Sequence, residues 1–102
     1  MREIEKIIDQ IHDEIEGAEE YYKCAKEFKE KNITIANTYL ELAQVELTHV
    51  DKLHSIAVTL INKEKELKKP IPTGMDEIWD WLHKKIIEEV EELKFKIAKF
   101  KS

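Results

Sequence analysis

The chain has 102 residues, of which 38% are charged and 42% are hydrophobic, and its formal net charge is −5 at pH 7. A chain of this length forms one domain with a modest core, and the acidic balance argues against nucleic acid or an anionic membrane as a partner. No apolar run approaches the ~20 residues of a membrane span, and the amphipathic N-terminus predicts no signal peptide. The single cysteine, Cys24, cannot form an internal disulfide, so we expect a reducing, cytoplasmic location.

Two glycines and two prolines are too few turn residues for a strand-rich fold, so the sequence predicts an all-α protein. We expect a single domain over 1–102, with a long antiparallel helical hairpin over about 2–69 and a third helix over about 74–101. The first helix should run from about Arg2 to Lys31. Its apolar residues recur every three or four positions, at Ile4, Ile7, Ile11, Ala18, Tyr21, Ala25 and Phe28.

The second helix should run from about Ile33 to Leu67 or Lys69, after a short polar break in which Asn32 can end one helix or cap the next. Its seam comprises Ile35, Tyr39, Leu42, Glu46, His49, Leu53, Ile56 and Leu60. A second stripe flanks this seam, formed by Ala36, Ala43, Leu47, Val50, His54, Ala57 and Ile61. So wide an apolar face indicates neighbours on two sides of the helix.

The segment KPIPTG at 69–74 is the clear helix breaker, and the third helix should follow from about Met75 to Lys101. Its apolar face comprises Ile78 or Trp79, Leu82, Ile86, Val90, Leu93, Ile97 and Phe100. We expect Trp79 in the core and Trp81 either half exposed or in an interface. Three helices enclose only a thin core, so we expect at least a homodimer, in which two hairpins form a four-helix bundle.

Polar side chains interrupt the apolar seams of both hairpin helices. Glu46 and His49 occupy seam positions of the second helix, and Glu14 occupies one in the first. In an antiparallel hairpin that turns near Asn32, the three lie within about one helical turn of the same height. A carboxylate in an apolar interior must be paired, protonated or bound to a cation. Since Glu46 and His49 share one helix face, both can reach one metal ion.

Three ligands do not fill an octahedral site, but two hairpins about a two-fold axis would bring together four glutamates and two histidines. This is the ligand set of carboxylate-bridged di-iron and di-manganese bundles. We therefore expect two Fe ions per dimer, with Mn or Zn as alternatives. The competing interpretation is a buried polar layer that fixes register and dimer pairing, without metal.

The segments EIEGAEEYYKCA (14–25) and LELAQVELTHVDKL (40–53) resemble the Glu helix and the ExxH helix of rubrerythrin-type members of the ferritin-like superfamily. One helix of each kind is similar to the half-length encapsulated ferritins, and the complete chain also resembles small phage-encoded ferritin-like proteins. The resemblance implies Fe(II) binding and oxidation, with Glu46 as bridging ligand, Glu14 and His49 as terminal ligands, and Tyr21 hydrogen-bonded to a ligating carboxylate. It also leaves open a capsid or shell partner and a location in a phage particle.

The chain departs from these relatives in two respects. It carries no recognisable encapsulin-targeting tail after the third helix, and no CxxC module of the rubredoxin type. The alternative function is a non-catalytic helical structural or adaptor protein, such as a phage accessory protein, with a buried polar layer in place of a metal site.

Three further residues are weaker metal-ligand candidates: His54, Asp80 and His83. A hydrogen-bonded structural histidine is the favoured interpretation of His54. Asp80 and His83 form an i, i+3 pair. If the third helix folds back about residue 71, His83 lies level with residue 59, about 15 Å from His49 along the bundle. His83 should therefore not share the first site.

Overall fold

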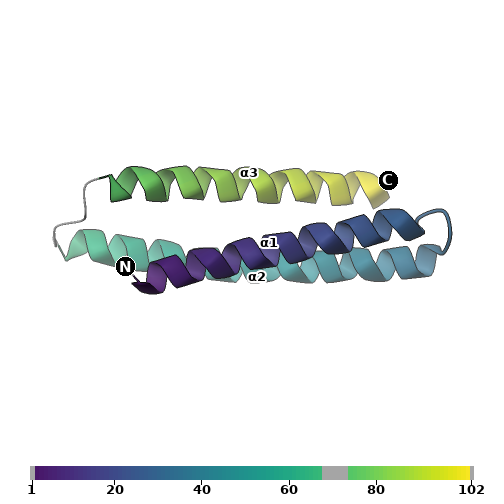
Figure 1. The fold of residues 1–102 in the computed structure, drawn as a ribbon, viewed down its shortest axis with the longest axis horizontal. Coiled ribbons are helices and arrows are strands. Elements are labelled where there is room, and N and C mark those ends of the chain that lie inside the picture. Colours follow the sequence, from purple (N-terminus) through teal and green to yellow (C-terminus); the bar gives the residue numbers. More distant parts are fainter. Residues whose placement is uncertain (1, 68–73, 102) are drawn as a thin grey trace.

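The computed structural model describes residues 2–67 and 74–101, which form three α-helices. Helix α1 spans Arg2–Phe28, α2 spans Ile33–Glu66 and α3 spans Met75–Lys101. The helices lie side by side in a rod 56 Å long, with α1 and α2 adjacent and α3 running along them (Figure 1). The all-α prediction is confirmed. Of the predicted breaker at 69–74, only Gly74 is described, and it has a positive φ of 84°; positions 69–73 lie outside the described residues.

The turn between α1 and α2 is closed by a cap that the sequence predicted. The Ile35 backbone N–H donates to the Asn32 side-chain oxygen at 3.2 Å, which satisfies one of the free amides at the start of α2. Phe28 ends α1, and its carbonyl accepts from the Asn32 N–H at 2.8 Å. α1 is therefore about one turn shorter than the predicted end at Lys31.

Small residues allow α1 and α2 to pack closely. Five alanines are buried in this interface and in the adjoining core, where larger side chains would hold the backbones apart. The buried residues of the hairpin are Ile4, Ile11, Ile15, Ala18, Ala25, Ala36, Leu40, Ala43, Leu47, Val50 and Ala57. The α1 prediction is thus largely confirmed, although it did not include Ile15.

In α2, the stripe that the sequence placed beside the seam is the one that the chain itself buries. Ala36, Ala43, Leu47, Val50 and Ala57 are all within it. The predicted seam instead lies on an open side of the helix, with Ile35, Leu42 and Ile56 each at least 38% exposed. α1 and α3 cover only part of the wide apolar face, and the remainder faces outward.

Helix α3 buries the face predicted for it: Trp79, Ile86, Val90, Leu93 and Ile97. Trp81 is 60% exposed. The α3 backbone stays farther from the hairpin than α1 and α2 stay from each other, so side chains span a wider gap there (Figure 1). Edge-to-face packing of Phe100 on Tyr22, with ring centroids 6.2 Å apart, joins α3 to α1.

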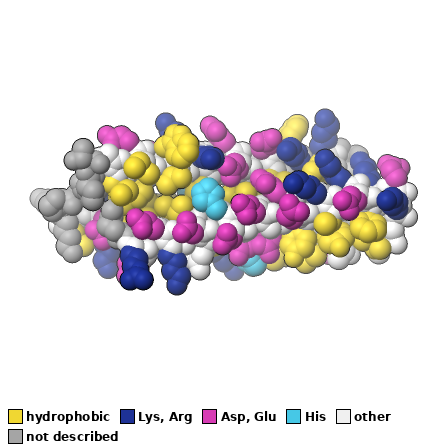
Figure 2. Space-filling model, viewed as in Figure 1, with side chains coloured by type: hydrophobic (Ala, Val, Ile, Leu, Met, Phe, Trp, Pro, Cys, Tyr) yellow, Lys and Arg dark blue, Asp and Glu magenta, His cyan; other side chains and the backbone are white. Residues whose placement is uncertain are grey.

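The described helices carry charge along their whole length. Figure 2 shows acidic and basic side chains mixed over one face, with lysines gathered toward the end that holds the carboxyl terminus. Among residues 2–67 and 74–101, no helix is both long and apolar enough to span a bilayer.

Candidate metal centre

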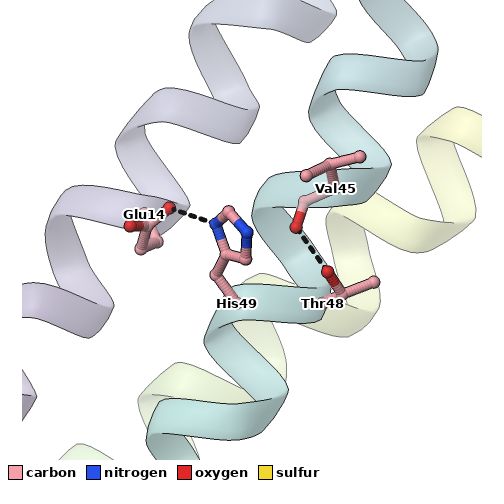
Figure 3. Close-up of polar contacts among 4 residues, drawn as sticks. All are labelled: Glu14, Val45, Thr48 and His49. Atoms are coloured by element: carbon pink, nitrogen blue, oxygen red, sulfur yellow. Dashed lines mark hydrogen bonds and ion pairs between the residues drawn. The ribbon is translucent and has the colours of Figure 1, made fainter.

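Glu14, Glu46 and His49 converge at one place between α1 and α2. One ligand atom from each side chain lies within 4.8 Å of the other two, and no other described group of three potential ligands does so. His49 Nδ1 is 3.2 Å from Glu14 Oε2, and the two side chains face each other across the helices in Figure 3. Ligands on opposite sides of a metal bound at about 2.1 Å are about 4.2 Å apart. Small side-chain rotations would therefore bring all three atoms to one ion.

Helix geometry explains this convergence. Glu46 and His49 are three residues apart on α2, so they project from the same side of the helix in successive turns. Glu14 reaches them from α1 at the height expected for a hairpin that turns at Asn32. The prediction that these three side chains lie together is confirmed by their distances.

The two carboxyl groups affect each other's protonation. A hydrogen bond shared with Glu46 lowers the pKa of Glu14, and the neighbouring His49 lowers it further against the effect of partial burial. The same hydrogen bond raises the pKa of Glu46, and burial raises it too. The two pKa values are thus shifted in opposite directions, because the two carboxyl groups interact and Glu14 is the one beside His49.

Gly17 makes room for the Glu46 side chain, a role that the sequence analysis did not foresee. A Cβ at this position would lie 3.3 Å from Glu46 Oε2 and 3.6 Å from its Cδ. Gly17 sits in the middle of α1, where glycine is intrinsically unfavourable by about 1 kcal/mol relative to alanine. A glycine within a predicted helix, one turn after a candidate ligand, is the signal that could have revealed it.

The site is open to solvent in the single chain, whereas the sequence predicted a buried position. The side chain of Glu14 is 30% exposed and that of His49 is 45% exposed. They border a shallow hollow of about 300 Å³, which is also lined by Gln10, Lys52 and Leu53. The burial prediction was wrong for the isolated chain because the seam of α2 faces away from α3.

An apolar stripe runs along α2 through this open site. Measured around the helix at 100° per residue, its members lie within about 40° of His49. Four of them have exposed fractions between 38% and 49%: Ile35, Leu42, Val45 and Ile56. Leu53 and Leu60 are half-buried on the same side. We refer to these six residues as the α2 stripe.

Tyr21 lies two turns beyond Glu14 on α1. Its ring stacks on that of Tyr39, with centroids 6.2 Å apart, and Tyr39 stacks in turn on Phe28. No hydrogen bond joins the Tyr21 hydroxyl to Glu14, Glu46 or His49 among the contacts of the described residues. Within one chain, Tyr21 is therefore a packing residue.

His54 and His83 meet at the α2–α3 contact, with His54 Nε2 2.9 Å from His83 Nδ1. His83 is thus level with residue 54 and not with residue 59, a difference of about 7.5 Å along the bundle. Burial lowers the pKa of His54, as does the nearby His83, while the charge of Asp51 acts in the opposite direction. Asp80 is exposed and belongs to no three-ligand group within the described ranges.

Comparison with protein-family models, curated proteins and solved structures gave no match to this chain. The ferritin-like resemblance therefore stays an expectation from the sequence, and the geometry of the Glu14, Glu46 and His49 cluster carries the functional interpretation.

Proposed function

We propose that this protein binds iron and oxidises Fe(II), at a di-iron carboxylate site completed by a second copy of the chain. The supporting observation is the convergence of Glu14, Glu46 and His49 from two helices onto one point. Two carboxylates and one imidazole suit Fe(II) or Mn(II), and Zn(II) also binds such ligands.

A second copy is favoured because the unfilled coordination positions and the exposed apolar side chains lie in the same place. Three side chains leave about half of a six-coordinate shell empty. The α2 stripe runs through the site with its apolar side chains exposed, and apolar patches of this kind mark interaction surfaces. Docking two stripes about a two-fold axis would bury them and bring a second Glu14, Glu46 and His49 beside the first.

The resulting centre would hold two metal ions between four glutamates and two histidines, as in di-iron bundles. By the ferritin-like resemblance, Glu46 would be the bridging ligand, and Glu14 and His49 would be terminal ligands. The balanced reaction takes two Fe(II), one O₂ and two protons, and yields two Fe(III) and one H₂O₂. The carboxylates would stabilise Fe(III) over Fe(II) because the added positive charge strengthens their attraction. Gly17 keeps the space into which the Glu46 carboxylate extends.

Anaerobic loading with Fe(II), followed by exposure to O₂, tests this proposal. We expect about one iron per chain, a dimer by light scattering, and Fe(III) formation that follows O₂ addition. Glu46→Gln should abolish both iron loading and oxidation. Glu41→Gln is the matched control, since Glu41 is exposed on the same helix and outside the cluster. A monomer that takes up no iron, or equal loading of the two variants, would overturn the proposal.

The second candidate is a structural or adaptor role without metal. It is favoured because Glu14 already has a partner without a metal: its carboxylate accepts a hydrogen bond from the His49 ring at 3.2 Å. Such a layer can fix the register of a helical dimer. Under this function, Glu14→Leu raises the free energy of unfolding and iron leaves it unchanged. Under the iron-binding function, Fe(II) raises the melting temperature of the unmodified protein and not that of Glu14→Leu.

A further inference from the structure

The contact between His54 and His83 has features that a structural hydrogen bond does not require. Their ring centroids are 4.6 Å apart and the ring planes are inclined by 37°. The two nitrogens are 2.9 Å apart. If the rings pointed straight at each other across that distance, their centroids would be farther apart than they are. The imidazoles therefore approach at an angle, and lines drawn outward from the two nitrogens can meet at a point beside the contact.

The nitrogen separation also fits a particular coordination geometry. Two nitrogens bound to one metal at about 2.0–2.1 Å, and at a right angle to each other, are ~2.9 Å apart. Tetrahedral coordination at the same bond length requires a wider separation of ~3.3 Å. Right-angled N and O ligation is the preference of Cu(II) and Ni(II).

The sequence around the pair supplies further ligands of the right kind. The segments DKLH (51–54) and DWLH (80–83) each place an aspartate three residues before the histidine, one turn away on the same helix side. The Asp51 carboxylate is close enough for its charge to act on the His54 ring. Both histidines are only partly buried, so an ion can reach them from solvent.

We propose that His54 and His83 form a second metal site, which takes a Cu(II)- or Ni(II)-class ion and ties α3 to α2. Water, or Asp51 and Asp80 after side-chain rotation, completes the coordination. The site is separate from the Glu14, Glu46 and His49 cluster, because His54 lies about 140° around α2 from His49. It does not depend on iron binding or on a dimer.

The link matters for α3, whose backbone lies farther from the hairpin than the hairpin helices lie from each other. A metal bridge between the helices would hold α3 in place beyond what its apolar side chains do. Loading of this site would therefore raise the melting temperature by stabilising the folded state.

Titration with Cu²⁺ and with Ni²⁺ tests the site, in a background carrying Glu46→Gln and His49→Gln so that the first cluster is silent. Trp79 and Trp81 lie on α3 within four residues of His83, and quenching of their fluorescence by Cu²⁺ reports binding nearby. We expect one ion per chain. Since loss of an outer-shell partner alone costs about 10–100-fold in affinity, His54→Gln and His83→Gln should each weaken binding at least as much.

The matched control is His12→Gln, because His12 is half-buried on α1 and belongs to neither cluster. It should leave the titration unchanged. The electron paramagnetic resonance spectrum of the Cu²⁺-loaded background protein should show two nitrogen ligands, a readout that does not depend on whether a variant folds. The proposal is overturned if the background protein binds neither ion at micromolar concentration, if its spectrum shows fewer than two nitrogens, or if His12→Gln weakens binding as much as His54→Gln.

Discussion

Gly17→Ala should affect the stability of the fold and the proposed metal binding in opposite directions. Gly17 lies inside α1, so alanine should stabilise the helix by about 0.8–1 kcal/mol. For a domain of 60–100 residues, 1 kcal/mol corresponds to a rise in melting temperature of about 4–8 °C. The added Cβ, however, would lie 3.3 Å from Glu46 Oε2, so the carboxylate must move by a few tenths of an ångström. We expect the metal-free protein to become more stable while metal binding weakens.

The size of the binding loss follows from the kind of contact involved. Glu46 is displaced and not removed, so the effect should resemble the loss of a group that orients a ligand, about tenfold in affinity. Tenfold corresponds to about 1.4 kcal/mol, which exceeds the stability gained in the helix. Metal should therefore raise the melting temperature of Gly17→Ala by less than it raises that of the unmodified protein.

Calorimetric titration with Fe(II) or Mn(II), paired with thermal unfolding of the metal-free protein, measures both effects. Glu16→Ala is the matched control, because Glu16 is the adjacent residue, is exposed and lies outside the Glu14, Glu46 and His49 cluster. It should leave metal affinity unchanged. If Gly17→Ala binds metal as tightly as the unmodified protein, Glu46 is not held at a ligand position by the space over Gly17, and the reasoning fails.

Three further substitutions test the packing, the turn and the α2 stripe. Ile11 is fully buried, so Ile11→Ala should lower the free energy of unfolding in urea by about 2–5 kcal/mol. Ile33 is 54% exposed, so Ile33→Ala should lower that free energy far less. Equal losses for the two variants would contradict the assigned core. Asn32→Ala removes the cap of α2 and should cost about 1 kcal/mol in the same assay, so an unchanged midpoint would show that the cap contributes nothing. Leu42→Lys places a charge in the α2 stripe, so the molar mass measured by light scattering should fall toward that of the monomer. Asn62→Lys, on the opposite side of α2, should leave the molar mass unchanged. If Leu42→Lys remains a dimer, docking through the stripe is refuted.

Much of the candidate site could be predicted from the sequence because helices have a fixed rise and a fixed angle per residue. The spacing of Glu46 and His49 placed them on one helix side, and the single polar break at Asn32 set the register that brings Glu14 opposite them. Gly17 escaped notice because its importance depends on which side chain packs across from it. His83 was expected level with residue 59 and instead lies level with His54, because the height of α3 depends on packing between helices, which periodicity alone does not specify.

The sequence by itself determined that this protein is three amphipathic helices, where they begin, and that two carboxylates and an imidazole share one height in the hairpin. It did so because these properties depend on local periodicity and on one short turn. Only the tertiary structure decided which side of α2 is buried and which is open. That choice depends on how closely α1 and α3 approach α2. The distance of approach is set by the volumes of side chains on all three helices, so the hydrophobic pattern of one helix does not specify it.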